Sequence, residues 1–131
     1  MFRDTDSFSS FAVPDIEAAR RFYGETLGLK VTDSNEAGLL ELHTGGGSPV
    51  LVYPKPDHRP APFTVLNFVV PDIDRAVREL NAKGVELERY DLGGEARPDE
   101  LGIYRGQGPS IGWFTDPAGN IISVLERPAG S

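Results

Sequence analysis

The stretch Phe11-Ala12-Val13-Pro14-Asp15-Ile16-Glu17 returns in closely similar form as Phe68-Val69-Val70-Pro71-Asp72-Ile73-Asp74, 57 positions later in the chain. Each copy reads as the end of an apolar strand followed by a Pro-Asp pair, where the Asp is a favourable helix N-cap. A repeat of about half the chain implies two copies of one supersecondary unit. We therefore expect any cleft between the copies to be lined by equivalent positions of both.

Length and composition limit the class of protein. A chain of 131 residues can bury roughly two thirds of its unfolded surface, so we expect a single domain, 1–131, made of two modules. Its 39% hydrophobic and 25% charged content is ordinary for a globular protein, and no apolar run approaches the ~20 residues that span a bilayer. The N-terminus lacks a basic flank followed by an apolar stretch, so the sequence indicates no secretory signal and no membrane partner.

Charge and cysteine content exclude several functions. The net charge of -7 argues against a nucleic-acid partner, whose phosphates require a basic stripe. The acidic balance is compatible with a cationic ligand, although solubility alone also explains it. The chain has no cysteine, which excludes disulfides, thiolate nucleophiles and cysteine metal ligands and is consistent with a cytoplasmic location.

The first module, 7–54, reads as a βαβββ unit. Its helix is expected to begin after Asp15 and to end near Gly28, a favourable C-terminal cap. Alternation of apolar and polar residues predicts the strands. They are expected at 7–13, 29–32, 38–43 and 49–54.

The second module, 64–127, repeats this order after a proline-rich linker, 55–63. Its helix is expected from Asp72 to about Lys83. The strands are expected at 64–70, 85–90, 112–115 and 121–126. A long connection, 91–110, interrupts the pattern, and loops of that length are either functional lids or solvated excursions. The sequence thus predicts an α+β fold of two tandem βαβββ modules.

Two βαβββ units with this motif resemble the vicinal oxygen chelate superfamily, which includes glyoxalase I, extradiol dioxygenases, fosfomycin-resistance enzymes and bleomycin-binding proteins. The resemblance covers 7–127 and is most specific at 13–19, 22–24, 27–29 and the turn 116–120. It implies U-shaped half-barrels around a cleft, usually completed by a homodimer. It does not imply one reaction, because a fold hosts many functions.

Metal enzymes of this superfamily place His or Glu at four equivalent cleft positions. The resemblance assigns these positions to Phe8, Leu51, Val65 and Ser123. None of these side chains supplies the imidazole or anionic oxygen that a catalytic divalent ion requires. We therefore expect no metal and no other cofactor, and the sequence leans away from an enzyme without settling the question.

Glu41 and His43 place a carboxylate and an imidazole two positions apart in one predicted strand. Alternation puts Leu40 and Leu42 on one face and leaves Glu41 and His43 together on the other. A carboxylate and an imidazole so placed can share a proton, bind a ligand or supply two metal ligands, which are too few alone. A polar strand rim without chemistry is the favoured interpretation of the pair, followed by ligand hydrogen bonding and then by catalysis or metal binding.

Alternation along every strand predicts a mostly apolar and aromatic cleft lining with a few hydrogen-bonding groups, which is typical of a pocket for a small organic molecule. The predicted ligand-binding residues are Phe8, Ser10, Glu41, His43, Leu51, Tyr53, Val65, Asn67, Trp113, Ile121 and Ser123. The aromatic members could stack on a planar or cationic group. The alternative is a cleft filled by its own side chains or closed by a partner subunit.

These patterns favour a cytoplasmic homodimer that sequesters an apolar or aromatic small molecule without a metal. The acidic composition is compatible with a cationic ligand of this kind. The resemblance is greatest to the bleomycin-binding branch, and no catalytic residue is predicted. The alternative is a metal-dependent lyase, isomerase or dioxygenase of the same superfamily that uses Glu41 and His43 as non-standard ligands. A third interpretation is a member whose cleft serves assembly alone.

Overall fold

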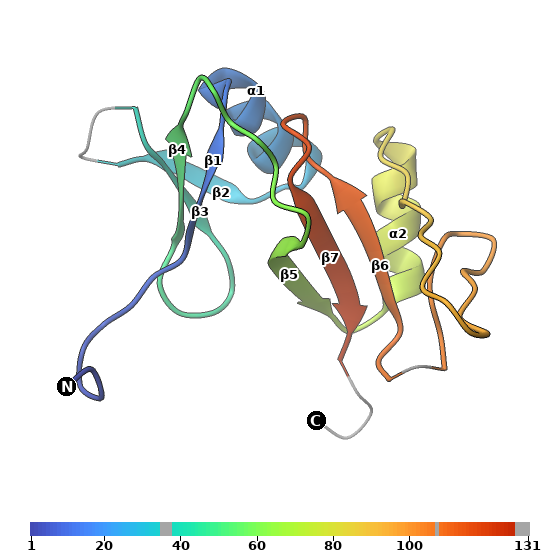
Figure 1. The fold of residues 1–131 in the computed structure, drawn as a ribbon. Helices are drawn as coiled ribbons and strands as arrows, with labels where there is room; N and C mark the ends of the chain where they lie inside the picture. The colour runs from blue at the N-terminus through green and yellow to red at the C-terminus, as the bar shows by residue number, and fades with distance from the viewer. Residues whose placement is uncertain (35–37, 107, 128–131) are drawn as a thin grey trace. The chain divides into compact units, whose positions relative to one another are not determined.

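The protein is described here by a computed structural model covering residues 1–34, 38–106 and 108–127. The chain divides into two compact units, Met1–Arg59 and Pro60–Ser131. Each unit contains one sheet and helical structure, so the predicted α+β class is confirmed (Figure 1). The boundary between the units lies within the proline-rich segment 55–63. None of the helices in the described residues is long and apolar enough to cross a membrane.

The first unit has the predicted βαβββ order. Its elements are β1 (Ser10–Val13), α1 (Ile16–Arg21), the π-helical turn η1 (Phe22–Thr26), β2 (Lys30–Asp33), β3 (Leu40–His43) and β4 (Val50–Pro54). The strands lie in the order β1-β4-β3-β2, with β1 and β4 parallel and the other pairs antiparallel. The strand expected from residue 7 begins three residues later, so Phe8 precedes it and is 64% exposed.

The sequence determines both ends of the first helical segment. Asp15 is the N-cap, and its carboxylate accepts hydrogen bonds from the amides of Glu17 and Ala18 at 3.0 and 3.1 Å. The chain leaves the helical turn through Gly28, whose φ of 75° is a conformation that glycine adopts without strain. Between these ends, Phe22 and Tyr23 are buried and pack edge to face. These two aromatic residues are therefore part of the core.

The second unit contains β5 (Thr64–Val70), α2 (Ile73–Ala82), β6 (Ile111–Thr115) and β7 (Ile121–Glu126). The strands lie in the order β5-β7-β6, with β5 and β7 parallel and β6 and β7 antiparallel. Helix α2 lies along one face of this sheet (Figure 1). Asp72 caps α2 by accepting a hydrogen bond from the Arg75 amide at 3.1 Å, as the repeat predicts.

The strand predicted at 85–90 is absent from the second unit, where one isolated bridge joins Glu88 to Trp113. A side chain takes over the hydrogen bonds that a strand partner would make. The Tyr104 hydroxyl accepts from the Tyr90 amide at 2.6 Å and donates to the Tyr90 carbonyl at 2.7 Å. The amide and the carbonyl of Tyr90 therefore both have a hydrogen-bond partner in the connection, and Tyr90 does not require pairing with another strand.

Two close contacts explain why the second unit packs as it does. Gly112 lies close to Leu87, and a Cβ at position 112 would meet the end of the Leu87 side chain. The turn after β6 is held by buried Asp116, whose carboxylate accepts from the Ala118 and Asn120 amides at 2.9 and 2.8 Å and from Asn120 Nδ2 at 3.0 Å. This turn was predicted from its sequence, 116–120, but its buried hydrogen-bond network was not.

Candidate functional site

Four residues of the first unit lie side by side across its sheet, one on each strand. Ser10 lies beside Leu51, Leu51 beside Glu41, and Glu41 beside Thr32. We call these residues the Thr32 row. On the opposite face, the neighbouring residues Leu40, Leu42 and Val52 are fully buried. The row therefore lies on the face that the core does not use.

A hydrogen-bonded cluster occupies one end of this row. Thr32 Oγ1 lies 3.1 Å from Glu41 Oε1 and 2.7 Å from His43 Nε2, and all three side chains are half-buried. Alternation had already placed Glu41 and His43 on one face. Thr32 was missed, since its participation depends on the register between β2 and β3, which pairs Thr32 with Glu41. The available signal was a threonine in the neighbouring predicted strand, which an antiparallel pairing of the two strands can bring beside Glu41.

The remaining predicted residues of the first unit are more exposed. Tyr53 lies two positions after Leu51 on β4 and is 39% exposed, and Ser10 is exposed at the start of β1. Phe8 precedes β1, so the alternation of strand residues does not determine which way its side chain faces.

The second unit has an equivalent row. Asn67 on β5 lies beside Ser123 on β7, Ser123 beside Trp113 on β6, and Trp113 beside Glu88. We call these residues the Trp113 row. Ser123 is fully buried and its hydroxyl donates to the Asn67 side-chain carbonyl, so a residue predicted to face a ligand instead positions its neighbour.

Trp113 is held in place by contacts on several sides. Its Nε1 donates to Thr64 Oγ1 at 3.1 Å, across β7, and this satisfies the partner that an indole nitrogen needs. Its ring packs edge to face with Tyr90 and Tyr104 at centroid distances of 5.8 and 5.5 Å. The indole is nevertheless only half-buried. The result is a rigid, partly exposed aromatic surface.

Thr64 is a second residue that the sequence did not reveal. Strand β5 shifts its register between Thr64 and Leu66, so Thr64 lies beside Ile121. Uninterrupted alternation gives that position to Val65 instead. Thr64 was missed because a register irregularity within a strand leaves no reliable trace in the apolar pattern.

The four positions at which relatives would hold a metal do not fit one. Phe8, Leu51 and Val65 have no donor atom, and the Ser123 hydroxyl is neutral and already hydrogen-bonded to Asn67. Within residues 1–34, 38–106 and 108–127, no group of three or more His, Asp or Glu side chains lies close enough together to hold an ion.

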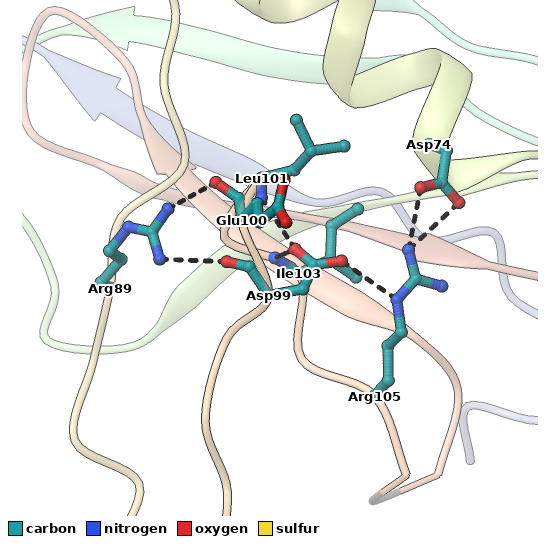
Figure 2. A network of polar contacts seen from close by, with 7 residues as sticks. All are labelled: Asp74, Arg89, Asp99, Glu100, Leu101, Ile103 and Arg105. Carbon is teal, nitrogen blue, oxygen red and sulfur yellow. Dashed lines mark hydrogen bonds and ion pairs between the residues drawn. The ribbon is translucent and has the colours of Figure 1, made fainter.

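The long connection 91–110 is fastened by the charged network in Figure 2. Arg105 contacts Asp74 on α2 at 3.0 Å and Asp99 at 3.1 Å, and its hydrogen bonds to both raise its pKa. Burial raises the pKa of Asp99, but hydrogen bonds from the Ile103 amide, Arg105 and the Leu101 amide outweigh it and lower that pKa. Arg89 donates to the carbonyls of Asp99 and Glu100 (Figure 2). This charged network holds the loop in place. None of its residues belongs to the predicted site.

Two units of strand, helix and antiparallel hairpin, each with a row of neighbouring side chains across its sheet, define a duplicated α+β protein. The chain belongs to the glyoxalase/bleomycin resistance protein/dioxygenase superfamily, whose family model matches residues 7–124. The predicted resemblance is confirmed. Comparison with curated proteins gives no match.

Several solved structures share the fold. A glyoxalase family protein from Bacillus anthracis is 24% identical with a TM-score of 0.70, covering 98% of this chain and 100% of the other. An antibiotic-binding protein from Streptomyces sp. CB03234 is 22% identical with a TM-score of 0.68, covering 95% and 98%. A lactoylglutathione lyase from Agrobacterium tumefaciens is 20% identical with a TM-score of 0.66, covering 94% and 93%. These similarities establish the fold, and both binding proteins and enzymes occur among them.

Proposed function

We propose that this protein binds a small aromatic molecule without using a metal ion. The observation that carries the proposal is the Trp113 surface, where a half-buried indole is fixed by Thr64, Tyr90 and Tyr104. A preorganised ring of this kind stacks on a planar ligand with little loss of side-chain entropy. The family's metal positions, occupied by Phe8, Leu51, Val65 and Ser123, support a role that needs no ion. The antibiotic-binding protein of similar fold is a precedent for sequestration.

The chain contains a single tryptophan, so intrinsic fluorescence reports directly on Trp113. A panel of planar aromatic amines, neutral aromatics and aromatic acids is titrated into the protein with and without EDTA. We expect at least one class to change the fluorescence saturably, with the same affinity in EDTA. At a hundredfold excess over its Kd, such a ligand should stabilise the fold by about 2.7 kcal/mol.

Trp113→Ala, followed by calorimetry because the fluorophore is gone, should weaken binding about tenfold. Phe2→Ala is the matched control, since it removes an aromatic side chain that is 76% exposed and lies outside both rows. Equal affinity in Trp113→Ala and wild type would remove Trp113 from the site. Binding that disappears in EDTA would contradict the metal-independent proposal.

An enzyme is the second candidate, and the contacts among Thr32, Glu41 and His43 favour it. Under this hypothesis the chain is a lyase, isomerase or dioxygenase with non-standard metal ligands. A divalent ion would then stabilise the protein, and Glu41→Gln with His43→Gln would abolish turnover. Stabilisation by aromatic ligands alone favours the first proposal.

We further propose a cytoplasmic homodimer. Strand β5 is at the edge of its sheet and Val69 is 51% exposed there, so this edge has unpaired backbone groups and apolar surface to cover. Native mass spectrometry gives the subunit number, and a monomer at micromolar concentration would contradict the proposal.

A further inference from the structure

The cluster of Thr32, Glu41 and His43 determines where its hydrogens lie. One threonine hydroxyl contacts two partners, Glu41 Oε1 at 3.1 Å and His43 Nε2 at 2.7 Å. A hydroxyl has one hydrogen to donate and can accept in addition. An ionised carboxylate only accepts, so the Thr32 hydrogen points to Glu41.

The imidazole must then be the donor in the second contact. With its hydrogen directed to Glu41, Thr32 Oγ1 presents lone pairs to His43 Nε2, and the distance of 2.7 Å is a hydrogen bond only if Nε2 carries a hydrogen. The neutral ring therefore has its hydrogen on Nε2, and Nδ1 is left with a lone pair. The chain of donors runs from His43 through Thr32 to Glu41.

Two acceptors remain after these bonds are made. Among the described residues, neither His43 Nδ1 nor the second carboxylate oxygen of Glu41 has a hydrogen-bond partner. Both residues are half-buried, so an acceptor here is more valuable to a ligand than one in bulk water. Lys30 lies beside His43 on β2 but is exposed and forms no ion pair with Glu41 in the described part of the chain.

We infer that Thr32 fixes His43 as the Nε2-H tautomer, and that His43 Nδ1 and Glu41 together accept hydrogens from an N–H donor group of a small organic ligand. The inference rests on the proposed function in taking a small organic molecule as the ligand. Thr32 is a positioning residue, because it acts through the His43 ring. The ligand class is an amine or amide rather than a carboxylate, which would present only acceptors to these two acceptors.

The tautomer is measurable without a ligand. Long-range proton–nitrogen NMR separates the two ring nitrogens of each histidine, and His58→Gln assigns the spectrum because the chain contains only two histidines. At a pH where His43 is neutral, we expect its Nε2 to be protonated and its Nδ1 to be unprotonated. A hydrogen on Nδ1 in the wild-type protein overturns the inference.

Two substitutions test the role of the hydroxyl. Thr32→Val keeps the β-branched shape of a strand residue and removes the donor and acceptor, so His43 should become a mixture of tautomers. Thr32→Ser restores the hydroxyl and should restore the Nε2-H form. An unchanged tautomer in Thr32→Val overturns the positioning role.

Fragment titration tests recognition, with benzylamine as the donor probe and benzoate as the matched acceptor probe. Benzylamine should shift His43 Nδ1, benzoate should not, and Thr32→Val should weaken benzylamine binding about tenfold with rescue in Thr32→Ser. A shift of the Trp113 indole N–H without any shift of His43 would overturn this inference and leave the proposed function standing. Equal response of His43 to benzoate, or no response to benzylamine, overturns the inference as well.

Discussion

The two rows occupy equivalent positions in the two units and carry different chemistry. Ser10, Leu51, Glu41 and Thr32 in the first unit correspond by strand register to Asn67, Ser123, Trp113 and Glu88 in the second. The first row places a carboxylate where the second places an indole. The comparison teaches that the repeat preserves the backbone register at these four positions, whereas the side chains of the rows have diverged into a hydrogen-bonding half and an aromatic half.

The hairpin turns differ as much as the rows. In the first unit the turn after β3 is glycine-rich, and the Thr44 hydroxyl makes a long 3.4 Å contact with the Gly46 carbonyl at the surface. In the second unit the corresponding turn is built on Asp116 and Asn120, both buried and bonded to one another. The turn of the first unit is a glycine-rich surface connection, whereas the turn of the second unit is part of the core.

Asp116→Ala should therefore give the largest loss of stability, about 3 kcal/mol, because it removes the acceptor of three hydrogen bonds, two from backbone amides and one from the buried Asn120 side chain. Thr44→Ala is the matched control in the other turn and should stay within about 0.5 kcal/mol of wild type. Urea unfolding measures both. Equal losses in the two variants would show that the turns do not differ as described.

Exchanging one pair of equivalent residues tests whether the rows are interchangeable. Ser123→Leu, which copies Leu51, should destabilise the protein by about 2 kcal/mol, because Ser123 is fully buried and a larger side chain there must displace its neighbours. Leu51→Ser should cost about 1 kcal/mol, since Leu51 is only half-buried. Urea midpoints with unchanged m-values would measure these differences, and a neutral Ser123→Leu would contradict the tight packing.

Tyr104→Phe probes the segment that replaces the missing strand. The substitution removes both hydrogen bonds to the Tyr90 backbone and should lower the free energy of local opening by about 1.5 kcal/mol. Hydrogen exchange of the Tyr90 amide measures this directly. Unchanged protection of that amide would mean that other contacts hold the segment.

Acidification should have the smallest effect. The pKa of folded Asp99 lies below its usual value of 3.8. The charged network of Asp99 therefore contributes fully to the free energy of unfolding at pH values above the unfolded-state pKa. This contribution is lost as the pH falls through the lower pKa of the folded state. The contribution should be about 0.5 kcal/mol, because the Arg105 ion pairs are partly exposed. Asp99→Asn should lack this part of the pH dependence in urea unfolding from pH 6 to pH 2.5, and an identical pH profile would remove Asp99 as its source.

Local signals predicted much of this fold. The helix caps Asp15 and Asp72 and the bounds of β5 and β7 follow from residues close in sequence. The contributions of Thr32 and Thr64 could not be predicted, because each depends on which residue of another strand lies alongside. The hydrogen bonds that hold the Tyr90 backbone were also hidden, since they come from the Tyr104 side chain, fourteen positions later in the chain.

Native mass spectrometry with added ions and ligands tests the central claim, that this protein binds an organic molecule at the Trp113 surface without a metal. The protein is sprayed alone, with Mn²⁺, Ni²⁺ or Zn²⁺, and with the aromatic compound that best changes Trp113 fluorescence. We predict a stoichiometric organic adduct, lost in Trp113→Ala, and no stoichiometric ion. One ion per chain, removed by Glu41→Gln with His43→Gln and required for the organic adduct, would contradict the account and favour the enzyme.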